Sequence, residues 1–170
     1  MIQVISPPSN PNINTIIPTI FLAGGITNCP DWQSEIIQMF EINMGIYDVV
    51  IFNPRRKDFP INNPTATELQ IRWEYEHLHD AAIIIFWFAR GSLNPIVLYE
   101  LGRWGNSSNR PIVIGCDPEY LRIRDIEIQT KLSRPDLVIH RSLESVANQT
   151  KRLIEDTDGL EWVKAKKGGR

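Results

Sequence analysis

The chain has 170 residues, of which 42% are hydrophobic, and its formal net charge at pH 7 is −2. This length is enough for one domain with a proper core, and the weak charge gives no sign of nucleic acid or a membrane surface as a main partner. No apolar run approaches the ~20 residues of a membrane-spanning helix, and residues 1–8 do not resemble a signal peptide, so we expect a cytoplasmic protein.

The amino-terminal half predicts three buried strands and two helices. Residues 1–18 are expected to form an irregular extension rich in proline and asparagine, with a short edge strand at residues 2–5. The three buried strands are predicted at 19–25, 49–54 and 81–88. Asp31 is expected to cap the first helix, which carries the apolar residues Trp32, Ile36, Ile37 and Phe40 and is closed by Gly45. The second helix is predicted to start at Thr65 or Thr67 and to run through Leu78.

The carboxyl-terminal half repeats this alternation. A helix is predicted to start at Asn94, and strands at 111–115 and 137–140 flank a mixed segment at 117–133. The last helix is expected to run from 143 to 164, before a frayed tail at 165–170. Alternating helices and continuous apolar strands indicate a parallel sheet covered on both faces. We therefore predict a single α/β domain over 19–164, a doubly wound, flavodoxin-like (Rossmann-like) sandwich with about five parallel strands.

The segment from Asn94 to Trp104 is the most informative in the chain. It follows the most apolar run, 81–88, and Asn94 is a good N-cap before Pro95 at the first helical position. Val97, Leu101 and Trp104 recur at helical spacing and predict the inward face. Glu100 lies on that same face, near the carboxyl end of a buried strand, where open α/β sheets bind ligands. Two structural roles remain as alternatives: a gain from the helix dipole, or an ion pair with Arg103.

Other groups are expected to converge on the same crevice. These are the Gly24-Gly25 turn, the turn from Asn53 to Arg56 and the loop 89–94. The glycines allow a close backbone approach to a ligand, but no GxGxxG or Walker A motif is present. Arg55 and Arg56 could hold an anion or could be solvated. A second acid would come from the helix before strand 81–88, which offers Glu68, Glu74, Glu76 and Asp80.

These residues resemble the nucleoside 2-deoxyribosyltransferase superfamily. The resemblance rests on Phe21-Leu22-Ala23-Gly24-Gly25, on Trp73-Glu74, on the strand 83–86 and on Tyr99-Glu100-Leu101-Gly102, and it covers roughly residues 19–125. It implies that Glu100 is a nucleophile that attacks the anomeric carbon of a deoxynucleoside and forms a glycosyl-enzyme. It also implies that Glu74, which replaces the aspartate usual in the family, protonates the departing base and deprotonates the incoming one.

The resemblance also has departures and further implications. Asn94 stands where transferases of the family commonly have Asp and monophosphate hydrolases have Ser, and Phe21 replaces a tyrosine. Asn94 can still hydrogen-bond a sugar hydroxyl. Asp125 falls nearest the family's sugar-binding asparagine, which a neighbouring subunit supplies, so a homo-oligomer is implied. The expected substrate-binding residues are Phe21, Gly24, Gly25, Asp31, Trp32, Asn53, Arg55, Trp73, Asn94 and Asp125.

The expected function is therefore that of a nucleoside 2′-deoxyribosyltransferase, with a deoxynucleoside and a free nucleobase as substrates. Two alternatives stay open: an N-glycosidase acting on deoxynucleosides or their 5′-monophosphates, with water as acceptor, and a non-catalytic nucleotide-sensing module. No cofactor is expected. Cys29 and Cys116 lack CxxC spacing and make no disulfide framework, so we expect both to be reduced thiols. His77, His79 and His140 form no metal-binding pattern, so no metal is expected.

Overall fold

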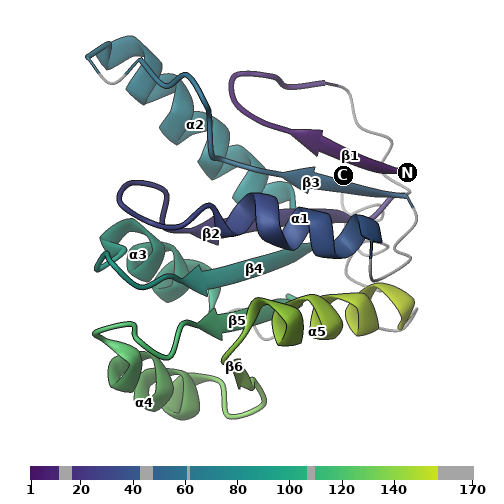
Figure 1. The fold of residues 1–170 in the computed structure, drawn as a ribbon, viewed down its shortest axis with the longest axis vertical. Coiled ribbons are helices and arrows are strands. Elements are labelled where there is room, and N and C mark those ends of the chain that lie inside the picture. Colours follow the sequence, from purple (N-terminus) through teal and green to yellow (C-terminus); the bar gives the residue numbers. More distant parts are fainter. Residues whose placement is uncertain (12–16, 43–47, 61, 107–109, 157–170) are drawn as a thin grey trace.

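The computed structural model describes residues 1–11, 17–42, 48–60, 62–106 and 110–156. Its strands are β1 (Ile2–Ile5), β2 (Thr19–Gly24), β3 (Val49–Phe52), β4 (Ile83–Phe88), β5 (Ile112–Cys116) and β6 (Ile139–His140). Its helices are α1 (Trp32–Ile42), α2 (Pro64–Asp80), α3 (Pro95–Trp104), α4 (Ile123–Ser133) and α5 (Leu143–Glu155). Figure 1 shows the strands side by side in one sheet with the helices packed around it.

All the described strands pair in parallel, in the order β1-β3-β2-β4-β5-β6. The chain moves outward from β2 in one direction to β3 and in the other direction through β4 and β5, which is the flavodoxin-like arrangement. The predicted doubly wound α/β fold is thus confirmed. The described sheet has six strands because residues 2–5 add an edge strand to β3. The strand order reverses between β2 and β4, and ligands in such sheets bind at the carboxyl ends of the strands beside this switch point.

Two apolar layers hold the helices to the sheet. Trp32, Ile36 and Phe40 of α1 pack with Val146 and Ala147 of α5 on one face. The other face is covered by α2, α3 and α4, whose contributions to the core are Trp73, Leu78, Val97 and Ile126. Because both faces are covered, every residue of β3, β4 and β5 is buried. This explains why those strands are continuous apolar runs instead of alternating ones.

Helix positions agree with the sequence-based expectations better than helix ends do. Asp31 caps α1 as predicted, since its Oδ1 accepts a hydrogen bond of 3.2 Å from the Ser34 backbone N–H. The predicted start of α2 at Thr65 or Thr67 is wrong, because Asn63 is the cap and Pro64 the first helical residue. Asn63 Oδ1 accepts from the backbone N–H of residues 65 and 66 at 3.0 and 3.2 Å.

The last helix is shorter than predicted. α5 ends at Glu155, and Asp156 takes an extended conformation, so the expected end at residue 164 is wrong. Gly45 and the tail 165–170 lie outside the described residues, and so do residues 157–164. The segment 117–133, which was predicted only as mixed, contains α4. Within the described ranges, no helix has the length and apolarity needed to cross a membrane.

Candidate active site

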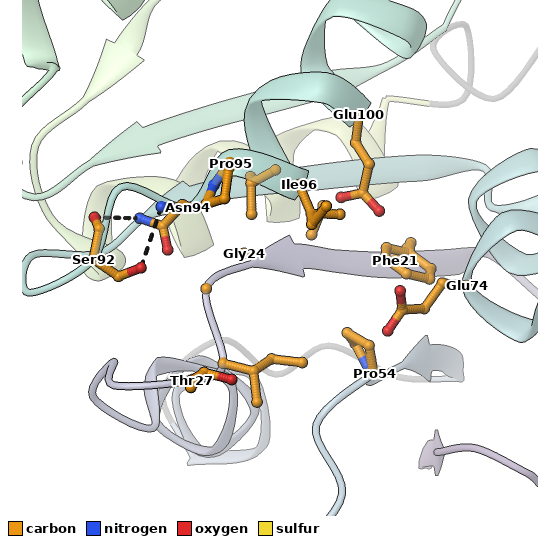
Figure 2. A pocket seen from close by; sticks show the side chains of 14 residues that line it. Phe21, Gly24, Thr27, Pro54, Glu74, Ser92, Asn94, Pro95, Ile96 and Glu100 are labelled. Atoms are coloured by element: carbon orange, nitrogen blue, oxygen red, sulfur yellow. Dashed lines mark hydrogen bonds between the residues drawn. The ribbon is translucent and has the colours of Figure 1, made fainter. Parts of the chain in front are cut away.

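A cavity of about 320 Å³ opens at the carboxyl ends of β2 and β4, beside the switch point of the sheet. Its lining residues come from the turn after β2, from the loop after β3, from α2 and from the start of α3. They are Phe21, Ala23, Gly24, Gly25, Ile26, Thr27, Pro54, Glu74, Ser92, Asn94, Pro95, Ile96, Val97 and Glu100. Figure 2 shows both glutamate side chains reaching into this space.

Glu100 reaches the cavity because α3 turns one face toward the sheet. Val97 is buried, and Leu101 and Trp104 pack against the core from the same helix, as predicted. Glu100 follows Val97 by nearly one turn and is half-buried. Burial, and secondarily the negative charge of Glu74, raise the pKa of Glu100 to about 8. Arg103 does not neutralise it: its guanidinium donates to the Tyr75 hydroxyl at 3.1 Å and lies over the Tyr75 ring.

Glu74 enters the cavity from α2 and is also half-buried. Burial raises its pKa, and a hydrogen bond from Gln70 opposes this rise. That bond joins Gln70 Nε2 to Glu74 Oε1 at 2.7 Å, one helical turn apart. The other acids expected on this helix, Glu68 and Glu76, are exposed, and Asp80 is the last residue of α2.

The two carboxyl groups form a coupled pair in surroundings that are mostly apolar. None of the described residues that line the cavity is a lysine, arginine or histidine. Two ionised carboxylates in such a place repel each other and lose hydration, so the pair retains a proton that free carboxyls would lose at neutral pH. A pair of this kind offers one proton donor and one nucleophile at the same time.

Asn94 lies in the cavity wall, but its side-chain amide forms hydrogen bonds within the loop between β4 and α3. Its Nδ2 donates to the carbonyl oxygens of Ala89 and Ser92 at 3.0 and 3.2 Å, so both amide hydrogens are used. Its backbone is left-handed, with φ of 48°, and its side chain makes no capping bond. Asn94 is the N-cap residue of α3 and Pro95 begins the helix, as predicted, but the Asn94 side chain makes no capping hydrogen bond. The amide instead folds back to close the loop between β4 and α3.

The two glycines after β2 are required by close packing. A Cβ at Gly24 would clash with the Trp32 indole, and one at Gly25 would clash with the side chains of Asn94 and Cys29. Both glycines also line the cavity. A ligand could approach their backbone from the cavity, but contacts within the chain are enough to account for the residue type.

Three residues expected in the site do not line the cavity but hydrogen-bond the segments around it: Asp31, Trp32 and Arg55. Trp32 Nε1 donates to the Gly25 carbonyl at 3.1 Å from the opposite core layer. Arg55 pairs with Asp31 at 3.1 Å and donates to Gln33 Oε1 at 2.8 Å, and further bonds reach the carbonyls of residues 29 and 30. The guanidinium of Arg55 is thus committed to holding the turn before α1 against the loop after β3.

The structure places Trp73 and Asn53 behind the cavity wall. Trp73 stacks on His77 with ring centroids 4.1 Å apart, contacts Phe21 and donates from Nε1 to the Ser9 carbonyl at 2.7 Å. Asn53 is buried and forms an Asx turn, since its Oδ1 accepts from the Arg55 backbone N–H at 3.0 Å. Phe21 packs against Trp73 and also lines the cavity, as expected.

Asp125 lies elsewhere on the molecule. It is exposed in the first turn of α4, pairs with Arg122 at 2.9 Å and lines a separate cavity between α3 and α4. The structure thus brings together Glu100, Glu74, Phe21, Gly24, Gly25 and Asn94 among the predicted residues. It adds Gln70, which the sequence analysis missed. The signal was available, because Gln70 precedes Glu74 by four residues and shares its helix face.

Comparison with known proteins shows that the part of the chain that forms this cavity matches a protein-family model. A family model described as nucleoside 2-deoxyribosyltransferase like matches residues 17–120, which include both glutamates and all the residues that line the cavity. A search of curated proteins gives no significant match.

Proposed function

Since the chain belongs to the nucleoside 2-deoxyribosyltransferase-like family, we propose that it transfers 2-deoxyribose from a deoxynucleoside to a second nucleobase through a covalent intermediate on Glu100. The observation that carries this proposal is the pair of half-buried carboxyl groups in one cavity. A cavity of about 320 Å³ is within the usual range for a small-molecule site.

The first step breaks the N-glycosidic bond. The ionised Glu100 carboxylate attacks the anomeric carbon, the bond to the base breaks, and its electron pair leaves with the base. Glu74 gives its proton to the departing nitrogen, which adds about 10²–10⁴-fold to the rate. Positive charge grows on the sugar in the transition state, and the Glu100 carboxylate stabilises it before forming the new bond.

The second step reverses these events with a different base. A ring nitrogen of the incoming base attacks the anomeric carbon, and the ester bond to Glu100 breaks. Glu74, now ionised, accepts the proton of that nitrogen. Two displacements at one carbon retain its configuration, as in retaining glycosidases. Because burial and the charge of Glu74 raise the pKa of Glu100 to about 8, the pair of carboxyl groups holds one proton at neutral pH, and cationic character on the bound sugar favours the position of this proton on Glu74.

A glycosidase that uses water as the acceptor is the second candidate, because it needs the same two carboxyl groups. The alternative of a non-catalytic sensing module fits the cavity less well. Burying two carboxyl groups side by side is costly, and a binding pocket for a neutral nucleoside gains nothing from that cost.

Base exchange tests the proposal directly. The protein is incubated with one deoxynucleoside and a second free base, and the products are separated by chromatography. The expected result is a new deoxynucleoside that contains the second base. Release of free base and deoxyribose alone would assign the protein to the glycosidase branch, and no turnover of any deoxynucleoside would exclude both.

The proposal includes an assembly of at least two copies. Asp125 lies in a different cavity from Glu100, so a role for Asp125 in sugar binding requires that it reach the catalytic cavity of another subunit.

A further inference from the structure

Gln70 is a polar side chain beside the cavity to which the proposed reaction gives no role. It is half-buried on α2. Its Nε2 donates to Glu74 Oε1 at 2.7 Å and to the Pro54 carbonyl oxygen at 2.8 Å. Gln70 therefore ties the carboxyl group of Glu74 to the loop that follows β3, and both of its amide hydrogens are used.

The Pro54 contact fixes the orientation of this amide. A backbone carbonyl only accepts hydrogen bonds, so the nitrogen of the amide, and not its oxygen, must face Pro54. The same nitrogen then faces Glu74 Oε1. A proton on Oε1 would compete with the N–H that already points at it, so the proton of a neutral Glu74 belongs on Oε2. Oε2 accepts no hydrogen bond from the part of the chain that the structure describes.

This orientation has a cost. Gln70 Oε1 is buried and has no hydrogen-bond donor among the described residues. A buried carbonyl oxygen without a protein donor is unfavourable, and an apolar side chain at this position would avoid that. An amide at residue 70 is therefore explained better by what its two N–H groups do than by packing.

We infer that Gln70 is a positioning residue that confines the transferable proton of Glu74 to Oε2, the oxygen that remains free to face the leaving base. This inference rests on the proposed function. A neutral donor suits the task, because it holds the carboxylate in place without the charge of a lysine or arginine, which would keep Glu74 ionised and unable to act as an acid.

Among the described residues, few charged groups face the Glu74 carboxyl group and could shift its pKa. Across the cavity, α3 contributes Glu100, and the loop after β3 contributes Arg55, which is paired with Asp31. The nearest residue of β2 in the cavity wall is Phe21, which carries no charge. On α2 itself, His77 points to the core, where it stacks on Trp73. The Gln70 hydrogen bond also opposes the rise that burial causes in the pKa of Glu74.

Two substitutions with opposite electrostatic effects test the inference in the turnover assay. Gln70→Met keeps the length and removes the donors, so the basic limb of the kcat/KM profile against pH moves up by roughly one unit or more. The value of kcat at the optimum falls about tenfold while KM changes little, because an acid remains but is no longer oriented. Gln70→Lys supplies charged donors, so the basic limb moves down.

Glu76→Gln, an exposed change on the same helix, is the matched control and leaves the profile in place. If Gln70→Met and Gln70→Lys moved the limb in the same direction, or left it unmoved, Gln70 would have only a structural role. If Gln70→Met failed to fold, the downward shift in Gln70→Lys would still decide the question.

A titration without substrate separates this inference from the proposed function. The side-chain carboxyl carbon of Glu74 is followed by NMR in ¹³C-labelled protein and is assigned by its loss in Glu74→Gln. Its apparent pKa should rise in Gln70→Met and fall in Gln70→Lys, whether or not the protein turns over a deoxynucleoside. An unchanged pKa in an active enzyme would refute the role of Gln70 alone, whereas a shifted pKa in a protein without turnover would refute only the proposed function.

Discussion

Glu100 shows how a sequence pattern can identify a residue without giving its chemistry. Its spacing from Val97 and Trp104 predicts an inward position, and the structure confirms that position. The sequence could not show that the Arg103 guanidinium donates to the Tyr75 hydroxyl instead. The Glu100 carboxyl group therefore has no ion pair with a cation among the residues that the structure describes. The raised pKa follows from that arrangement, because it depends on contacts between helices that are distant in the sequence.

Glu100→Gln should stabilise the protein, and the gain should grow with pH. In the unfolded chain Glu100 ionises near 4.5, and in the folded protein near 8. Between these values the folded state binds more protons, so the contribution of Glu100 to the free energy of unfolding falls as pH rises and levels off above about 8. A glutamine does not ionise, so the free energy of unfolding of the variant exceeds that of wild type by on the order of a few kcal/mol at pH 8 and by little at pH 5.

Urea unfolding of wild type and Glu100→Gln across this pH range measures the gain. Glu76→Gln, at an exposed acid of α2, is the control and should show no such trend. A constant difference between Glu100→Gln and wild type at all pH values would contradict the raised pKa.

At the scale of elements, strands and helices could be predicted, but their ends and the loops between them could not. Continuous apolar runs predicted the buried strands, because both faces of the sheet are covered. The start of α3 at Asn94 and Pro95 was predicted, but the hydrogen bonds of the Asn94 amide were not, because this amide can bond either the helix or its own loop. Its backbone is left-handed, and its side chain bonds Ala89 and Ser92 instead of the helix. That choice depends on the shape of the whole loop, which local spacing does not encode.

Asn94→Asp therefore tests the loop between β4 and α3. A carboxylate cannot donate to the carbonyls of Ala89 and Ser92 and would face them with a negative charge. We expect a loss of about 2–4 kcal/mol in the free energy of unfolding at neutral pH, and a smaller loss when the new acid is protonated.

Urea denaturation measures this loss, with Asn148→Asp, an exposed change on α5, as the control. If Asn94→Asp raised KM and left stability unchanged, the Asn94 amide would be a ligand-binding group rather than a brace for the loop.

At the scale of the whole molecule, the charges around the cavity favour a neutral substrate. The described lining of the cavity contains two glutamates and no lysine, arginine or histidine. The two arginines of the loop after β3 are engaged elsewhere: Arg55 with Asp31, and Arg56 over the Phe59 ring. The sequence suggested Arg55 as an anion-binding group because it could not show this pairing across 24 residues.

A deoxynucleoside should be preferred to its 5′-monophosphate by about tenfold or more in kcat/KM. Repulsion between the phosphate and the two carboxyl groups costs a few kcal/mol of binding free energy at the effective dielectric of a protein. The preference should shrink as salt concentration increases. Comparison of the two substrates at low and high salt checks this, and a clear preference for the monophosphate would move the protein to the hydrolase alternative.

The proposed assembly can be tested by mixing two inactive variants. Glu100→Ala lacks the nucleophile, and Asp125→Ala lacks the group expected from a neighbouring subunit. If the catalytic cavity combines both residues from different copies, denaturing and refolding the two variants together should restore part of the activity. Activity that stayed at the level of the separate variants would place Asp125 outside the site.

The most direct test of the proposed mechanism is to identify the covalent intermediate. The protein is mixed with a deoxynucleoside alone, quenched in acid during turnover and digested, and its peptides are analysed by mass spectrometry. We expect a 2-deoxyribosyl group on Glu100, absent from Glu100→Gln and formed more slowly in Glu74→Gln. Full turnover with no adduct, or with an adduct on another residue, would contradict the assignment of Glu100 as the nucleophile.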